Sequence, residues 1–385
     1  MLQYAIGVGA ALALGSIGLQ AQVSAPCASP RFDVAVNFDT GLFASGVAIG
    51  DFNRDGLADM AVTNQNSANV SVLPGDGKGG FGGKTDFAVG GPPQRIATAD
   101  LDGDGTLDLV LPLQAADAVA VLWGDGKGGF SAPAMFAVSG GPFMPVVADF
   151  NGDGHLDVAV TTRTEGSRRV AVLLGTGIRS FRTASFYGLF QNAPAALGVG
   201  DFNRDGLLDL AVGGGTNAPA GSNNLSIFLA DGKDGFGTPS VYTVGPDPQS
   251  MSVADLNGDG LLDIAISNSL PRGTNSTVSV LFGDGKGTFR ERLPLEIGVT
   301  GRGTGVADFN GDGSPDLVIA NNDSNTVSVL LGDGRGHFAA RADFKVGTGP
   351  RKLTVGDLNG DGRADIVVPN TGSNNVSVLI NSCRP

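Results

Sequence analysis

The chain has 385 residues, of which 62 are glycine and only 16% are charged. No long amphipathic pattern at helical spacing follows the first 20 residues, so the composition favours an all-β protein with many tight turns and short buried strands. The formal net charge is −13 and the sequence shows no basic patch, which argues against nucleic-acid binding.

The N-terminus carries an apolar segment. Residues 1–26 contain no charged side chain, and residues 4–19 are rich in Ala, Gly and Leu. This run has the length of a signal-peptide core and is too short and glycine-rich for a stable membrane span. It favours export over a cytosolic N-terminal strand or a lipid anchor at Cys27. We therefore expect a signal peptide at 1–26, a mature domain at 27–385, and a secreted or cell-surface location.

A nine-residue segment, Asp-x-Asn/Asp-x-Asp-Gly-x-x-Asp, occurs seven times, each time after a short apolar run. The intervals between copies are 49, 49, 52, 54, 53 and 49 residues, and a nearly fixed period of this size indicates a repeat architecture. The copies begin at Asp51, Asp100, Asp149, Asp201, Asp255, Asp308 and Asp357.

One repeat contains four short strands. In the second unit, strands are predicted at 95–99, 109–111, 118–123 and 135–138, with the Asp-rich segment between the first two. Four short strands in about 50 residues is the size of a β-propeller blade. The sequence therefore predicts an all-β, seven-bladed propeller of four-stranded blades.

A glycine-rich segment, Gly-Asp-Gly-Lys-Gly-Gly-Phe, closes the third strand at Gly75 and Gly124 and recurs in varied form in other units. Lysine among glycines resembles a phosphate-binding loop, but no helix follows, and Asp-Gly between two strands is typical of a hairpin turn. We interpret the segment as a turn. The phenylalanine that ends it, such as Phe81 or Phe130, is predicted to fill the core.

The two ends of the chain are predicted to meet. The last unit lacks a fourth strand, and Phe32 precedes Asp51 by the 19 residues that separate Phe81 from Asp100. Residues 32–38 should therefore complete the seventh blade as its outer strand. On the same register Cys27 and Cys383, the only cysteines, come together, which predicts a disulfide and supports an oxidising compartment.

The Asp-rich segments have the chemistry of a cation-binding loop. Positions 1, 3, 5 and 9 turn their oxygens inward, glycine at position 6 permits the bend, and position 7 offers a backbone carbonyl. Oxygen ligands with three or more carboxylates favour Ca²⁺ over Mg²⁺ or Zn²⁺. The alternative, that Asp and Asn only cap turns, does not explain why all seven copies keep Asp at positions 1, 5 and 9.

We expect up to seven Ca²⁺ sites, one in each loop. In every loop the first Asp is a ligand, and the other ligands follow the same register. Position 3 is Asn53, Asp102, Asn151, Asn203, Asn257, Asn310 and Asn359. Position 5 is Asp55, Asp104, Asp153, Asp205, Asp259, Asp312 and Asp361. Position 7 is Leu57, Thr106, His155, Leu207, Leu261, Ser314 and Arg363. Position 9 is Asp59, Asp108, Asp157, Asp209, Asp263, Asp316 and Asp365. The loops hold 22 of the 38 acidic residues, so much of the acidity is explained by metal ligands.

The repeats resemble the FG-GAP/VCBS repeats of integrin α-subunit propellers and of secreted microbial propellers. The resemblance covers residues 32–380 with all seven loops intact, while the integrin-type Phe-Gly signature is poorly kept, so the secreted VCBS-like branch is favoured. It implies that each loop joins the two inner strands of a blade and binds Ca²⁺ on one face of the disc. It fixes no activity.

Three classes of function are open. The first is a binding or adhesion module that binds a protein or glycan ligand and contains structural calcium. The second is a lectin, which the scarcity of aromatic platforms disfavours, since Trp123, Tyr187 and Tyr242 are the only Trp and Tyr after the leader. The third is a polysaccharide-active enzyme, which we do not expect, because His155 and His337 are the only histidines and no catalytic triad can be assembled.

A ligand should meet the face opposite the calcium loops, where the connections between strands vary. We expect the protein to be a monomer that binds no nucleic acid. Candidate ligand-binding residues in these connections are Phe43, Phe143, Arg163, Arg168, Arg169 and Phe190.

Overall fold

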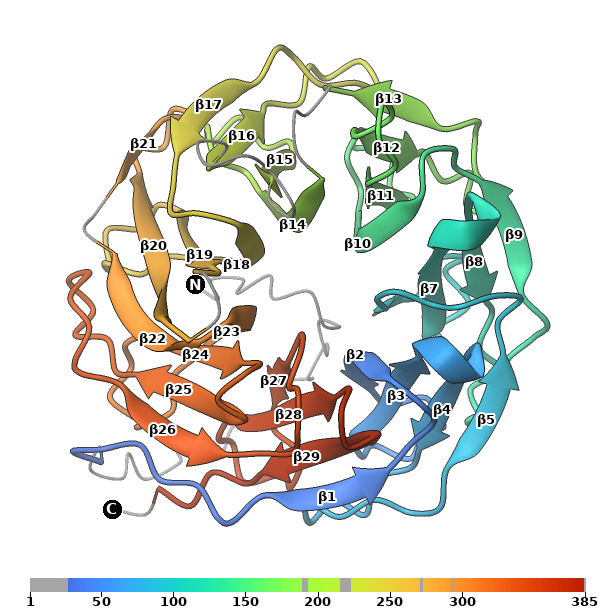
Figure 1. Ribbon diagram of the computed structural model, residues 1–385. Helices are drawn as coiled ribbons and strands as arrows, with labels where there is room; N and C mark the ends of the chain where they lie inside the picture. The colour runs from blue at the N-terminus through green and yellow to red at the C-terminus, as the bar shows by residue number, and fades with distance from the viewer. Residues whose placement is uncertain (1–26, 189–192, 215–222, 271–272, 292–293, 384–385) are drawn as a thin grey trace, which may run out of the picture.

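The computed structural model describes residues 27–188, 193–214, 223–270, 273–291 and 294–383. Seven antiparallel sheets surround a central channel, so the predicted seven-bladed propeller is confirmed (Figure 1). The helical segments of the described part are two single turns of 3-10 helix, η1 (Gln65–Ser67) and η2 (Gln114–Ala116). The predicted signal peptide and Phe190 lie outside the described residues. Within the described part, no helix combines the length and apolarity needed to cross a membrane.

The first two strands of each blade form its inner half. The innermost strands line the channel and are β2 (Ala44–Gly50), β6 (Ala97–Ala99), β10 (Pro142–Ala148), β14 (Pro194–Gly200), β18 (Pro248–Ala254), β23 (Gly301–Ala307) and β27 (Thr354–Gly356). The second strands are β3 (Asp59–Asn64), β7 (Asp108–Leu113), β11 (Asp157–Thr162), β15 (Asp209–Gly214), β19 (Asp263–Asn268), β24 (Asp316–Asn321) and β28 (Asp365–Asn370). Every residue of the second strands is buried, as expected for a sheet covered on both faces.

The third and outer strands complete the blades. The third strands are β4 (Asn69–Leu73), β8 (Ala118–Leu122), β12 (Val170–Leu173), β16 (Asn224–Phe228), β20 (Asn275–Gly283), β25 (Thr326–Leu330) and β29 (Asn375–Leu379). The outer strands are β5 (Thr85–Ala88), β9 (Ala134–Ala137), β13 (Ser185–Tyr187), β17 (Ser240–Thr243), β26 (Ala342–Lys345) and, in blade 7, β1 (Val36–Asp39). Blade 5 departs from the four-stranded prediction, because two short strands, β21 (Phe289–Glu291) and β22 (Leu295–Val299), both pair with the long β20.

The ring closes as predicted. Strand β1 pairs with β29, with Phe38 opposite Val376, and an isolated bridge joins Phe32 to Asn381. The regular strand therefore starts later than residue 32, although pairing begins there. A disulfide links Cys27 to Cys383 across a Cα–Cα distance of 6.0 Å, which confirms the predicted pair.

The hydrophobic core lies between neighbouring blades. The cluster between blades 1 and 2, for example, contains Val72 and Leu111, both almost inaccessible to solvent. The predicted plugging phenylalanines sit at the edge of these clusters. Phe130 makes edge-to-face contacts with Phe52 and Phe87, with ring centroids 5.6 and 5.3 Å apart. The hairpin interpretation also holds, since Gly124 pairs with Phe130 across the glycine-rich turn.

The two faces of the disc differ in regularity. Each Asp-rich loop joins the first strand of a blade to the second, so all seven loops lie on one face. The connections from the second to the third strand, and from the outer strand to the next blade, lie on the opposite face and vary in length. At this second end, five innermost strands carry a register shift, between Ala44 and Gly46 in β2 and at the corresponding places in β10, β14, β18 and β23.

Candidate functional site

Each Asp-rich loop is built around the carboxylate at its ninth position. This aspartate is the first residue of the second strand and is at most 1% exposed in all seven blades. In blade 1, Asp59 accepts hydrogen bonds from the N–H of Phe52 at 3.0 Å and from the N–H of Gly75 at 2.8 Å. The same two backbone donors recur in every blade. The buried carboxylate thus ties the loop to the end of the third strand.

The backbone of the loop turns the other acidic side chains inward. Asp51 accepts from the N–H of Gly56 at 2.8 Å, and Asp55 accepts from the N–H of Leu57 at 2.8 Å. Equivalent bonds are present in the other six loops. Gly56 has a φ of 84°, a conformation that a residue with a Cβ rarely adopts. This is the physical reason for the glycine at position 6.

Burial has a clear electrostatic effect at position 9. Desolvation, together with nearby carboxylates of the same loops, raises the pKa of Asp108, Asp263 and Asp316 to about 7. Desolvation raises the pKa of Asp157, Asp209 and Asp365 to about 6. It also raises the pKa of Asp59. The loops therefore concentrate negative charge around a poorly solvated group, an arrangement that a cation would relieve.

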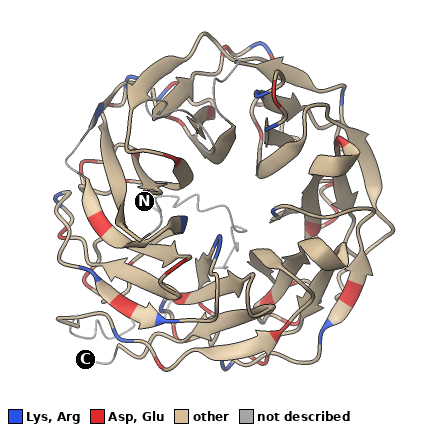
Figure 2. Ribbon diagram, in the orientation of Figure 1, with Lys and Arg blue, Asp and Glu red and all other residues tan. Residues whose placement is uncertain are grey.

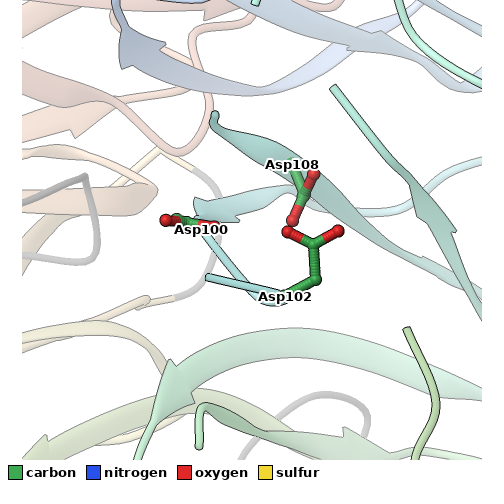
Figure 3. Close-up of side chains that lie close together, drawn as sticks. All are labelled: Asp100, Asp102 and Asp108. Carbon is green, nitrogen blue, oxygen red and sulfur yellow. The ribbon is translucent and has the colours of Figure 1, made fainter. Parts of the chain in front are cut away.

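The second loop gives the most direct test of whether these residues fit a metal. Carboxylate oxygens of Asp100, Asp102 and Asp108 lie within 4.8 Å of one another (Figure 3). Oxygens on opposite sides of one Ca²⁺ would lie about 4.6–5.2 Å apart, because Ca–O distances are about 2.3–2.6 Å. Asp100 Oδ1 is buried and accepts no hydrogen bond from the described residues. The donor set and its spacing fit a hard cation. The carbonyl ligand at position 7 stays a prediction.

One residue near this loop was not found by sequence reasoning. Arg179, in the turn after β12 of blade 3, pairs with Asp102 and with Asp104, the latter at 3.0 Å from Nη2 to Oδ2. Its guanidinium also lies 5.4 Å from the centre of the Trp123 ring. The second loop is the one with Asp rather than Asn at position 3, so an arginine from the next blade partly balances the additional charge.

The opposite face brings together some of the predicted ligand-binding residues. Phe143 is 7% exposed and belongs to strand β10 itself rather than to the connection before it. The Arg163 guanidinium lies 4.1 Å from the centre of its ring. Phe43 and Arg168 are partly buried. Arg169 lies instead over Phe186 of the outer strand β13, at 5.9 Å, away from the channel.

The structure also assembles a basic cluster that the sequence did not reveal. Arg95, Arg302, Arg351 and Lys352 come from three different blades and gather with Arg163 around the channel (Figure 2). The sequence contains no contiguous basic patch because each blade contributes only one or two of these residues. Their common register, five or six residues before the Asp-rich loop in all but Arg163, was the signal that could have located them.

Comparisons with known proteins agree with this architecture. The family model described as FG-GAP-like repeat matches residues 51–111, 113–160, 149–212, 201–266 and 308–368. A search of curated proteins found no match.

Similar solved structures share the fold at low sequence identity. The biofilm matrix protein Bap1 of V. cholerae is 12% identical, with a TM-score of 0.50, and the alignment covers 92% of this chain and 91% of that one. A proposed 6-phosphogluconolactonase of Bacteroides fragilis is 16% identical, with a TM-score of 0.59 and coverage of 79% and 84%. The Dos1 propeller is 13% identical, with a TM-score of 0.55 and coverage of 89% and 78%. Because the repeat model accounts for most of the propeller, the chain belongs to the FG-GAP-like repeat family.

Proposed function

We propose that this protein is a secreted, calcium-binding propeller that serves as a binding or adhesion module. The observation that carries the proposal is the sevenfold repetition of one oxygen-lined loop on a single face, each loop centred on a buried carboxylate. Bound Ca²⁺ would neutralise carboxylates that otherwise repel one another across the loop. Because each loop joins the two inner strands of its blade and its ninth aspartate also holds the end of the third strand, the role that we propose for the metal is structural.

The ligand would then meet the opposite face. Regular loops occupied by metal offer little variation, whereas the connections of the other face differ from blade to blade and surround the channel. Export is supported by the uncharged, apolar N-terminus and by the disulfide. A biofilm matrix protein among the structural neighbours is compatible with an extracellular binding role.

Two measurements test this proposal. Native mass spectrometry with added Ca²⁺ should show a ladder of bound ions, up to seven, and EDTA should lower the melting temperature sharply. A melting curve that is identical in Ca²⁺ and in EDTA would reject structural calcium. A glycan array with and without EDTA separates the lectin alternative, which requires a specific hit, from protein adhesion. Turnover of an arrayed polysaccharide would overturn both in favour of an enzyme.

A further inference from the structure

Five cationic side chains gather at the end of the central channel opposite the Asp-rich loops. We call them the channel cations: Arg95, Arg163, Arg302, Arg351 and Lys352. Four precede or begin innermost strands, which run from this face towards the loops, and Arg163 follows the end of β11, which runs the other way. The topology therefore places all five at one mouth of the channel. Figure 2 shows basic positions at the inner ends of several blades there.

A backbone irregularity that recurs at this mouth includes one of the channel cations. The register between β23 and β24 shifts between Gly301 and Gly303, so Arg302 is the additional residue of a bulge. Gln249 occupies the same position in β18, and Arg302 donates a hydrogen bond to its side-chain oxygen. Bulges redirect side chains at the rims of closed sheets. Here the bulged residues of two neighbouring blades, Gln249 and Arg302, are in contact with each other.

Three of the channel cations lack an acidic partner among the described residues. Asp247 acts on the other two, Arg163 and Arg302. Among the described residues, Arg95, Arg351 and Lys352 form no ion pair within 4 Å.

The individual contacts of these cations show the same imbalance. Lys352 Nζ lies 3.2 Å from the thioether sulfur of Met144, which is a weak acceptor. Arg95 is 6% exposed and donates from Nη1 to the carbonyl oxygens of Ser45 and Gln94, while its buried Nε has no hydrogen-bond partner among the described residues. The Nε of Arg351 is likewise buried without a partner in that part of the chain.

Aromatic rings lie against three of the guanidinium groups. Arg95 and Arg163 lie 5.0 and 4.1 Å from the centre of the Phe143 ring, and Arg351 lies 5.2 Å from that of Phe43. A guanidinium that stacks through its face keeps its N–H edge available, and that edge matches planar or tetrahedral oxyanions. Burial, together with the charges of Arg302 and Arg163, lowers the pKa of Arg351 to about 10.

We propose that this mouth binds a compact oxyanion, a carboxylate, sulfate or phosphate group, carried by the ligand that meets this face. Lys352 also lines a cavity of 290 Å³ that continues along the channel between Leu197, Met251 and Thr304, while the four arginines lie outside its lining. This inference rests on the proposed function, which assigns the ligand to this face. Its chemistry follows from the channel cations alone.

The experiment is calorimetric titration of the calcium-loaded protein in dilute buffer. The probes are inorganic sulfate, a trigalacturonate, and a neutral galactose trisaccharide. Sulfate and trigalacturonate should each bind at one site and compete with one another, while the neutral sugar should neither bind there nor compete. Tighter binding of trigalacturonate than of sulfate assigns an acidic glycan, and equal affinity assigns a free anion.

Variants locate the site. Lys352→Met should lower the affinity for sulfate at least tenfold without loss of melting temperature, because it removes a charge that has no carboxylate partner. Arg351→Gln is the second variant and should act in the same direction. Lys84→Met is the matched control, since Lys84 pairs with Asp86 on the outer strand β5.

Two outcomes would overturn the anion site: no one-site binding of either anion, or unchanged affinity in both Lys352→Met and Arg351→Gln. Either result, in a protein that Ca²⁺ still stabilises, would leave the proposed calcium-binding function intact. A protein that Ca²⁺ does not stabilise but that binds sulfate normally would reject the proposed calcium-binding function and leave the anion site intact.

Discussion

Asp108 accepts a hydrogen bond from the N–H of Gly124 at 2.9 Å and thereby joins the second strand of blade 2 to the turn that follows its third strand. Its other oxygen accepts from the N–H of Leu101 at 2.9 Å. One buried carboxylate therefore fixes the Asp-rich loop and the hairpin turn together. The same aspartate belongs to the group of three whose oxygens fit a cation, so the proposed metal binding would depend on the same atoms that stabilise the loop.

Replacement of this carboxylate by an amide should destabilise the protein. In Asp108→Asn one side-chain oxygen becomes an NH₂ group, which cannot accept from the second backbone N–H. An unpaired buried donor costs about 1–3 kcal/mol, so we expect the free energy of unfolding to fall by that amount in EDTA and by more in Ca²⁺. Urea unfolding in both buffers measures it. Asp33→Asn, at an exposed position, is the control, and equal stability of the two variants would contradict the role of Asp108.

We expect Arg179 to lower the Ca²⁺ affinity of the second loop. Its guanidinium pairs with Asp102 and Asp104, so it partly neutralises the charge that a metal ion would meet. We expect Arg179→Met to raise the Ca²⁺ affinity of this loop about two- to fivefold, because an exposed ion pair contributes about 0.2–1 kcal/mol. The metal-free variant should be slightly less stable than the parent. Calcium titration of single-loop occupancy by native mass spectrometry measures this change.

The control for that experiment is Arg182→Met. Arg182 pairs with Asp234, which lies outside the Asp-rich loops, so the variant removes a similar exposed arginine without a direct effect on the second loop. Equal calcium affinities in Arg179→Met and Arg182→Met would show that Arg179 has no specific influence.

The fold was predictable because the same sequence segment occurs in every blade. Seven copies of one segment give the blade number, and the 19-residue spacing from Phe32 to Asp51 places the N-terminal strand in the last blade, where β1 is found. The cysteine pair follows from the same register. The split outer edge of blade 5 was not predictable, because it depends on an irregular connection that no other unit repeats.

The loops of the candidate site were predictable in the same way, but their contacts with other blades were not. Arg179 and Asp102 are 77 residues apart, and nothing in their own repeats marks them as partners. The channel cations are scattered over several blades with one or two in each, and Arg302 is the additional residue of a strand bulge. Such features arise from tertiary packing of non-identical residues, so they require the structure.

Loss of the disulfide should weaken the closed ring. The bond between Cys27 and Cys383 closes a loop with a sequence separation of 356 residues. Chain-entropy models assign on the order of 5 kcal/mol to a loop of this size. We expect Cys27→Ser/Cys383→Ser to unfold at clearly lower urea concentration than the parent, while β1 still pairs with β29. Non-reducing peptide mapping of the parent should recover the two cysteines as one linked pair; recovery of both as free thiols would refute the bond.

Lys352 predicts a distinctive dependence of stability on alkaline pH. Burial, together with the charge of Arg95, lowers the pKa of its ammonium from 10.5 to about 8. Between pH 8 and 10.5 the folded protein therefore binds fewer protons at this site than the unfolded chain, so the contribution of Lys352 to stability improves as pH rises. At pH 7 the charged side chain opposes folding.

In a buffer without sulfate or phosphate, Lys352→Met should thus be more stable than the parent at pH 7, by on the order of 1–3 kcal/mol. The advantage should shrink steadily between pH 8 and 10, because the parent loses the unfavourable charge there while methionine does not titrate. Urea unfolding of both proteins at pH 7, 8, 9 and 10 measures the difference, in which the titration of other groups cancels. A difference that stays constant over this range would mean that the Lys352 ammonium is as well solvated in the folded propeller as in the unfolded chain.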